Sequence, residues 1–246
     1  MPPANHTLIW GIHPVTELLR DRPEMVSEIT IQTPGKSENI RKLTELAAKN
    51  RIRIHQTAKI VVPGEENPNH QGVVARLHEF RFAELGDLLE DLPASGFLVA
   101  LDSIQDPHNL GAIIRSAAAA GCGGLLIPKD RSATITGTVA KVAAGALSHI
   151  RICQVTNLAT SLQTLKDAGY WIFGADGHAD KTIYETDFTG PSCLVIGSEG
   201  KGIRPLVKKN CDQLVKIPMS GTIESLNASV AAGIVIFEIV RQQKNY

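Results

Sequence analysis

The chain of 246 residues has few cysteines, few aromatic residues and no long apolar run. Cys122, Cys153, Cys193 and Cys211 form no Cys-x-x-Cys pair, which favours buried thiols over a disulfide framework or a zinc site. No apolar run reaches the roughly 18 residues of a membrane span. The first residues, MPPANHTLIWG, have neither the basic nor the apolar region of a signal peptide. We therefore expect a cytoplasmic protein that binds neither a membrane nor a metal.

The formal net charge is zero, but the charges are unevenly distributed along the chain. Residues 36–59 hold seven basic side chains against two acidic ones, a balance of +5, whereas residues 79–91 have a balance of −4. A basic cluster of this kind is either a solvated surface or a footprint for nucleic-acid phosphates.

The pattern of apolar residues predicts two domains. Residues 1–76 alternate between helical and strand-like segments, with Ser37 as a candidate cap of a helix over 37–50. Residues 77–96 are acidic and end in Pro-Ala-Ser-Gly, which indicates a linker or a short bridging helix. Residues 97–246 alternate short runs of Val, Ile and Leu with helical segments. This alternation predicts an α/β domain with a mainly parallel sheet covered on both faces.

Three polar loops follow predicted strands of this second domain, where ligands of parallel sheets bind. They are DSIQDPHN (102–109), GSEGKG (197–202) and SGTIESLN (220–227). The second loop fits neither a P-loop nor a dinucleotide fingerprint, which disfavours an oxidoreductase. It is either a surface turn with a solvated Glu199 or a turn that lets the backbone approach a ligand.

Several polar residues in these loops have an ordinary structural interpretation. Asn109 is a candidate cap of a helix that Gly121 ends, and Ser225 and Asn227 are candidate caps of the last helix. Arg115 lies off the apolar stripe of its helix among alanines. It is either an ordinary exposed arginine or a residue that another chain or ligand approaches closely.

Three motifs resemble those of the SpoU (TrmH) family of RNA ribose 2′-O-methyltransferases, in the SPOUT superfamily. They are D-x-x-x-D-P-x-N-x-G-x-x-x-R-x-A from residue 102, I-G-S-E-G-x-G from residue 196, and I-P-M-x-G-x-x-x-S-L-N-x-S-V-A from residue 217. The resemblance covers residues 97–240. The segments GIHPVTELL and HQGVVARL further resemble members that methylate a guanosine ribose in 23S rRNA.

The resemblance implies a C-terminal SPOUT domain, in which a parallel sheet carries a trefoil knot, and a small N-terminal L30e-like α/β domain that binds RNA. Knots are rare exceptions among proteins, and no spacing in the sequence predicts this one. The resemblance also implies S-adenosyl-L-methionine as the cofactor, bent in the knot and held by backbone groups of Gly197, Ile217 and Leu226.

In the family pattern the active site consists of Asn109, Arg115, Glu199, Ser225 and Asn227. A ribose 2′-OH must be aligned with the methyl donor and relieved of its proton. Arg115 is a base proposed for this family, but a guanidinium with a pKa above about 12 seldom loses its proton. We therefore assign it the adjacent phosphate and the developing negative oxygen. Asn109 and Asn227 would orient ribose and loop, Glu199 would hold hydrogen bonds, and Ser225 would contact the hydroxyl.

The implied substrate is a guanosine ribose in the peptidyl-transferase region of 23S rRNA, in free rRNA or in a ribosomal precursor. Arg41, Lys42, Arg51 and Arg53 of the basic segment are the candidate RNA contacts. The alternatives are the same chemistry on tRNA or another rRNA nucleotide, and a non-catalytic RNA-binding factor of ribosome assembly. The complete set of five site residues disfavours the non-catalytic factor.

The last helix also bears on assembly, because Ser229 is its only polar side chain between Ala228 and Phe237. A helix that is apolar nearly all round needs cover on every side, and its own sheet covers one. The resemblance implies a homodimer through the knotted domain, with Arg115 close to the partner.

Overall fold

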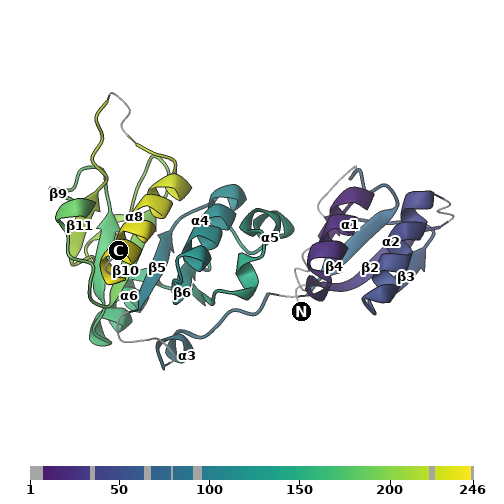
Figure 1. Ribbon diagram of the computed structural model, residues 1–246, viewed down its shortest axis with the longest axis horizontal. Coiled ribbons are helices and arrows are strands. Elements are labelled where there is room, and N and C mark those ends of the chain that lie inside the picture. The colour runs from purple at the N-terminus through teal and green to yellow at the C-terminus, as the bar shows by residue number, and fades with distance from the viewer. Residues whose placement is uncertain are drawn as a thin grey trace. The chain divides into compact units, whose positions relative to one another are not determined.

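The computed structural model describes residues 8–33, 37–63, 68–78, 80–90, 96–221 and 225–244 (Figure 1). Residue contacts divide the chain into two compact units, Met1–Arg81 and Phe82–Tyr246. Each unit has its own cluster of buried apolar side chains. No helix within the described ranges combines the length and the hydropathy that a membrane span requires.

The first unit contains a sheet whose described strands run in the order β1-β4-β2-β3. β2 and β3 are parallel, and the other neighbours are antiparallel. Val15 and Leu19 of one helix and Leu43 and Ala47 of the other are fully buried in one cluster with apolar residues of β2 and β4. The elements are β1 (Leu8–Trp10), α1 (Ile12–Asp21), η1 (Pro23–Met25), β2 (Val26–Gln32), α2 (Glu38–Lys49), β3 (Arg53–Thr57) and β4 (Val73–Leu77).

Helix α2 begins where the sequence predicts. The Ser37 side chain accepts a hydrogen bond from the backbone N–H of Ile40 at 3.2 Å, which satisfies one of the unpaired donors of the first turn. The predicted cap is therefore confirmed.

The acidic segment between the units is partly built into the second one. Helix α3 (Leu85–Glu90) inserts Leu88, which is 1% exposed, into the core of the second unit. A Cβ on Gly124 would lie 2.8 Å from the Leu88 side chain, so a strand glycine makes room for this leucine. Ala83 also donates its backbone N–H to the Ile152 carbonyl at 2.9 Å. The Pro-Ala-Ser sequence expected to act as a linker lies outside the described residues.

The second unit has a sheet in the order β7-β6-β5-β10-β8-β11-β9, and every pair of neighbours in it is parallel. The predicted α/β architecture with a parallel sheet is confirmed. The strands are β5 (Phe97–Asp102), β6 (Gly124–Pro128), β7 (Ile152–Val155), β8 (Trp171–Ala175), β9 (Lys181–Thr182), β10 (Ser192–Gly197) and β11 (Gln213–Lys216). The helices and 3-10 turns that follow or connect them are α4 (Pro107–Ala119), α5 (Gly137–Ala143), η2 (Ala146–Ser148), α6 (Leu158–Asp167), η3 (Ile183–Glu185), α7 (Pro205–Lys208) and α8 (Ala228–Gln243).

Helices cover both faces of this sheet. Alternate residues of β5 and β10, including Leu98 and Val195, pack in one cluster with α6 and α7. The intervening residues, such as Val99 and Leu194, are also fully buried and face the opposite way because side chains alternate along a strand. On that opposite face α4 and α8 lie side by side, and α8 contacts β10 (Figure 1).

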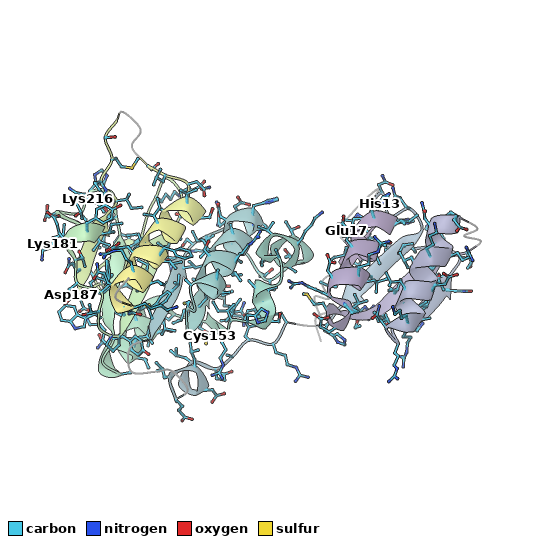
Figure 2. The ribbon with its side chains drawn as sticks, viewed as in Figure 1. His13, Glu17, Cys153, Lys181, Asp187 and Lys216 are labelled. Carbon is cyan, nitrogen blue, oxygen red and sulfur yellow. The ribbon has the colours of Figure 1, made fainter. Side chains whose placement is uncertain are left out.

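The four thiols are free, and three of them, among them Cys153 (Figure 2), are buried in the core. Burial raises the pKa of Cys122 to about 12 and that of Cys153 to about 11, because a thiolate is poorly solvated there. The expectation of buried thiols is therefore confirmed for Cys122, Cys153 and Cys193, whereas Cys211 is partly accessible.

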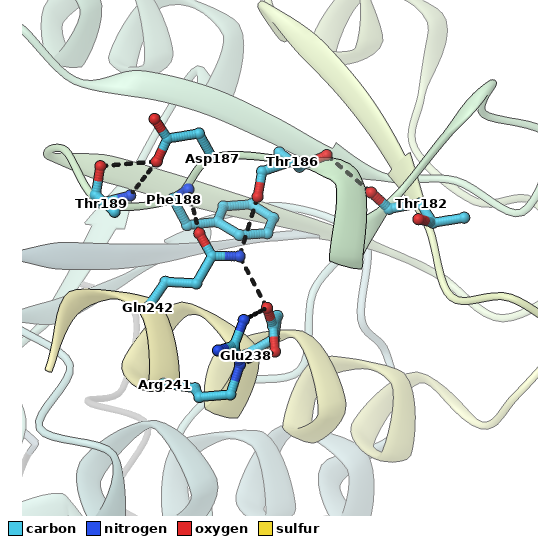
Figure 3. A network of polar contacts seen from close by, with 8 residues as sticks. All are labelled: Thr182, Thr186, Asp187, Phe188, Thr189, Glu238, Arg241 and Gln242. Atoms are coloured by element: carbon cyan, nitrogen blue, oxygen red, sulfur yellow. Dashed lines mark hydrogen bonds and ion pairs between the residues drawn. The ribbon is translucent and has the colours of Figure 1, made fainter. Parts of the chain in front are cut away.

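The C-terminal end of α8 is held by a polar network (Figure 3). Arg241 donates to the buried carboxylate of Glu238 at 2.8 and 2.9 Å and lowers the pKa of this group. Gln242 donates to Glu238 at 2.8 Å and to the Thr186 carbonyl at 3.0 Å, and it accepts from the N–H of Phe188 at 2.8 Å. These bonds fix the helix to the segment that precedes β10.

Candidate active site

The three polar loops follow β5, β10 and β11 at the carboxyl edge of the sheet, as the sequence predicts. β5 and β10 are direct neighbours, and their last residues, Asp102 and Gly197, are paired in register. Residues 222–224 of the third loop lie outside the described residues.

Asn109, Glu199 and Asn227 form a closed triangle of hydrogen bonds that joins the three loops. Asn109 donates to Glu199 Oε1 at 3.0 Å, and Asn227 Nδ2 donates to the same oxygen at 2.6 Å. Asn227 Nδ2 also donates to Asn109 Oδ1 at 2.9 Å. The N–H of Ala228 is a third donor to Glu199 Oε1, at 3.2 Å. The triangle thus joins the beginnings of α4 and α8 to the loop after β10.

Only one of the two oxygens of the Glu199 carboxylate accepts hydrogen bonds from described residues. Its Oε1 accepts three hydrogen bonds, whereas Oε2 accepts none from the described residues. Three N–H donors to one oxygen fix the orientation of this carboxylate. Glu199 is therefore a rigid carboxylate with one oxygen free to bind an incoming group.

Asn227 both caps α8 and belongs to the triangle. Its Oδ1 accepts from the N–H groups of Ser229 at 3.0 Å and Val230 at 3.3 Å, and from the Ser229 hydroxyl at 2.6 Å. Its Nδ2 makes the two bonds of the triangle. Since one amide offers acceptor and donor atoms at once, the structural and the functional interpretations of this residue are compatible.

Asn109 does not cap α4, contrary to the expectation from the sequence. The cap is Asp106, whose side chain accepts from the N–H of His108 at 2.9 Å, and Pro107 occupies the first helical position. Asn109 lies in the first turn, is 7% exposed and directs its side chain to Glu199. Gly121, with φ of 75°, does follow the end of this helix, as predicted.

The other two expected site residues are not joined to the triangle. Arg115 is exposed on α4, about 9 Å along the helix axis from Asn109. No hydrogen bond or ion pair connects its side chain to another described residue. Ser225 is exposed and likewise makes no such contact within the described part of the chain.

The glycines around Glu199 are needed for the backbone conformation of the loop that carries this residue. Residues 198–202 form a hairpin, with Ser198 N donating to Gly202 O at 3.1 Å and Gly202 N to Ser198 O at 2.9 Å. A Cβ on Gly197 would lie 2.2 Å from the carbonyl carbon of Gly202. Gly200 and Gly202 have φ of 78° and 63°. Gly197 is thus required by the hairpin that presents Glu199.

The carboxyl edge also has unpaired backbone groups. Ile217 and Leu226 are half-buried where the third loop begins and ends. Their backbone N–H and C=O groups take part in no hydrogen bond among the described residues. Within the same ranges no group of three or more His, Cys, Asp or Glu side chains is placed to hold a metal.

Asp102 and Arg204, for which the sequence predicts no role, form an ion pair below the hairpin in which the carboxylate is buried and the arginine side chain is 39% exposed. Arg204 Nε donates to Asp102 Oδ1 at 2.6 Å, and its backbone N–H donates to Oδ2 at 2.7 Å. Asp102 is the first residue of the first motif, so the sequence marks its position. The sequence does not indicate that Arg204 is its partner.

Two of the four candidate RNA contacts are neutralised on their own helix. Arg41 binds Glu38 at 2.9 Å and Glu45 at 3.3 Å, and Lys42 lies 3.7 Å from Glu38. The Arg41 guanidinium lowers the pKa of Glu38. Arg51 and Arg53 are exposed at the end of α2 and on the edge strand β3. Lys36 lies outside the described residues.

Comparison with known proteins gives two family matches. Residues 8–83 match the family described as RNA 2′-O ribose methyltransferase substrate binding, and residues 96–237 match the SpoU rRNA Methylase family. The chain is 44% identical to the 23S rRNA (guanosine-2′-O-)-methyltransferase RlmB of Pseudomonas aeruginosa, with 96% of both chains covered. It is 41% identical to the RlmB protein of Escherichia coli, with 96% of this chain and 98% of that one covered.

A solved structure extends the comparison to the fold. The SpoU methyltransferase AviRb from Streptomyces viridochromogenes, in complex with the cofactor AdoMet, is 26% identical to this chain with a TM-score of 0.71. The match covers 99% of this chain and 92% of AviRb.

Proposed function

Because the chain belongs to the SpoU rRNA Methylase family, we propose that it transfers a methyl group from S-adenosyl-L-methionine to the ribose 2′-OH of a guanosine in 23S rRNA. The observation that carries this proposal is the triangle of Asn109, Glu199 and Asn227, which unites the three motif loops. The relatives named RlmB match over nearly their whole length and support 23S rRNA as the substrate.

The residues at the carboxyl edge fit the cofactor. Ile217 and Leu226 offer backbone groups without partners in the described residues, and Gly197 ends β10 at the same edge of the sheet. We propose that these three residues hold S-adenosyl-L-methionine. When bound, this cofactor supplies an electrophilic methyl group on a positively charged sulfur. The family further implies that the chain around this site is threaded into a trefoil knot.

The five motif residues then divide the remaining tasks. The triangle fixes the start of α8 and aims the free oxygen of Glu199 at the ribose, so that Asn109 and Asn227 act through the loops they orient. Ser225 contacts the hydroxyl. Arg115 binds the adjacent phosphate and stabilises the developing negative oxygen, because its guanidinium keeps its charge.

We also propose a two-fold homodimer through α8. Val230 and Phe237 are 50% and 51% exposed and lie seven residues apart, on one stripe of this helix. Arg115 is exposed on the neighbouring helix α4 and is not joined to the triangle of its own chain. In the dimer it would serve the partner's site, which explains why a motif residue lies apart from the others.

Mixing two inactive variants tests the sharing of sites. An Arg115→Ala chain and an Asn227→Ala chain should regain part of the activity as mixed dimers. A monomer in sedimentation at working concentration would contradict the dimer, and a dimer without rescue would contradict only the shared role of Arg115.

We further propose that the first unit docks the RNA and that the protein acts in the cytoplasm, where ribosomes are assembled. Arg51 and Arg53 have no acidic partner among the described side chains, whereas Arg41 and Lys42 share Glu38. Charge reversal of Arg51 and Arg53 should therefore reduce the salt dependence of RNA binding more than reversal of Arg41 and Lys42. Each lost phosphate contact lowers the slope of log K against log salt by about 0.7–0.9. If the slopes of all variants equal that of the unaltered protein, the basic segment of residues 36–59 is only a solvated surface.

Mapping ribose methylation in total RNA from cells that lack this protein tests the substrate. The expected result is the loss of one guanosine mark in 23S rRNA. If rRNA methylation is intact and a tRNA mark is missing, tRNA is the substrate of the same reaction. No missing mark at all would favour a non-catalytic role in ribosome assembly.

A further inference from the structure

The hairpin that carries Glu199 is held on both faces of the sheet. On the face of α4 and α8, Glu199 accepts three hydrogen bonds from the beginnings of these helices. On the opposite face, Arg204, which follows the end of the hairpin by two residues, binds Asp102. Asp102 points to that face because it alternates with Leu98 and Ala100, which pack against α6.

Asp102 is fully buried, with 0% exposure, although it is a carboxylate. Besides the two bonds from Arg204, it accepts one from the Ser103 hydroxyl at 3.3 Å. A buried carboxylate is stable only when it is paired and hydrogen-bonded, so Arg204 has one favourable position. The backbone bond at 2.7 Å and the side-chain bond at 2.6 Å fix both the chain direction and the guanidinium at the base of the hairpin.

The chain between Glu199 and Arg204 has little conformational freedom. Asp102 and Gly197 are paired in register, so the ion pair lies at the strand ends from which the hairpin rises. Gly197 lets the chain after Gly202 pass over it in close contact. A shift of Arg204 would therefore move Glu199 relative to Asn109 and Asn227.

We propose that Asp102 is a positioning residue for methyl transfer, which acts through Arg204 to hold Glu199 in the hydrogen-bonded triangle. This inference rests on the proposed function for its kinetic consequence. Its structural consequence is independent of the substrate, because the bond from the Ala228 N–H to Glu199 Oε1 reports whether the carboxylate is in place.

The chain offers a matched control at the opposite edge of the same sheet. Asp212 also accepts from a backbone N–H, that of Ile172 at 2.9 Å, and from a cation, Lys166 at 2.6 Å. It lies at the beginning of β11, away from the carboxyl edge. Asp102→Asn and Asp212→Asn therefore each remove a carboxylate charge that is paired with one cation and one backbone N–H, although the Asp212 side chain is 22% exposed and that of Asp102 is 0% exposed.

The experiment compares these two variants by steady-state kinetics, thermal unfolding and amide hydrogen exchange. Asp102→Asn should lower kcat about tenfold, equivalent to about 1.4 kcal/mol of barrier, and leave the KM for RNA within about twofold because the first unit docks the RNA. The Ala228 amide should exchange at least about tenfold faster, since it loses its acceptor. Asp212→Asn should lower the unfolding temperature but change neither kcat nor the exchange of Ala228.

A double-mutant cycle tests whether Asp102 acts through Glu199. In a Glu199→Ala background, Asp102→Asn should cause no further loss of kcat, whereas independent effects would multiply. If Asp102→Asn does not fold, Arg204→Gln replaces it, because it removes the guanidinium and keeps the backbone bond. Unchanged Ala228 exchange, or multiplying effects on kcat, would overturn the proposal. Absence of methylation of 23S rRNA by the unaltered protein would overturn the proposed function only, since the exchange of Ala228 needs no substrate.

Discussion

Substitutions of Asn227 can separate helix capping from the function of the triangle, because different atoms of its amide serve the two. Oδ1 caps α8 through the N–H groups of Ser229 and Val230, and Nδ2 donates to Glu199 and Asn109. Asn227→Ser keeps a capping oxygen and removes the Nδ2 donor. Asn227→Ala removes both functions.

The expected losses follow from the bonds involved. A lost cap costs about 1 kcal/mol. The bond to the Glu199 carboxylate contributes about 1.5 kcal/mol and the bond to Asn109 about 1 kcal/mol, at the low end because Asn227 is exposed. Asn227→Ser should therefore destabilise the second unit by about 2.5 kcal/mol and Asn227→Ala by about 3.5 kcal/mol. A difference of about 1 kcal/mol corresponds to about 2–4 °C in the unfolding temperature.

Thermal unfolding and methyl transfer are measured on the same samples. Both variants should lose activity at least about tenfold and to a similar extent, because each opens the triangle and misplaces Glu199. Asn227→Asp should be less active than Asn227→Ser although aspartate caps well, since it puts a second carboxylate beside Glu199. Full activity of Asn227→Ser together with an intact unfolding temperature would refute this reasoning and leave capping as the only function of Asn227.

Three further predictions follow from individual contacts. Gly197→Ala should abolish cofactor binding in calorimetry, because the added Cβ would lie 2.2 Å from the hairpin backbone. Gly190→Ala, whose added Cβ would meet no atom within 4 Å, should bind the cofactor normally, and equal binding by both variants would contradict the hairpin's role. Cys122 and Cys153 should resist thiol reagents until the protein unfolds, and fast labelling of either thiol in the folded protein would argue against their burial. Because their folded pKa values of about 12 and about 11 exceed the ordinary value of 9.0, the free energy of unfolding should fall as the pH rises above 9.0. Ser37→Ala should destabilise the first unit by about 1 kcal/mol in denaturant titration, and no change would show that the cap contributes nothing.

The fold class was predictable because it depends on local patterns. Runs of Val, Ile and Leu separated by helical segments predict a parallel sheet covered on both faces, and every strand pair of the second unit is parallel. Ser37 as the cap of α2 was likewise a local matter, since the cap and its donor are three residues apart. Part of what was missed was also local: Asp106 before Pro107 is a cap signal, and Glu38 and Glu45 lie within one helical turn of Arg41.

The motifs indicated the site residues, but the contacts among these residues depend on the order of the strands in the sheet. Asn109 lies 90 residues from Glu199 and 118 from Asn227, and Asp102 lies 102 residues from Arg204. These bonds exist because β10 is inserted beside β5, which places strand ends from distant parts of the chain at one edge. A period of two or 3.6 residues determines which face of an element is apolar, and it contains no information about the order of strands in a sheet. The sequence therefore determined the elements and the chemical groups, and the sheet order determined their contacts.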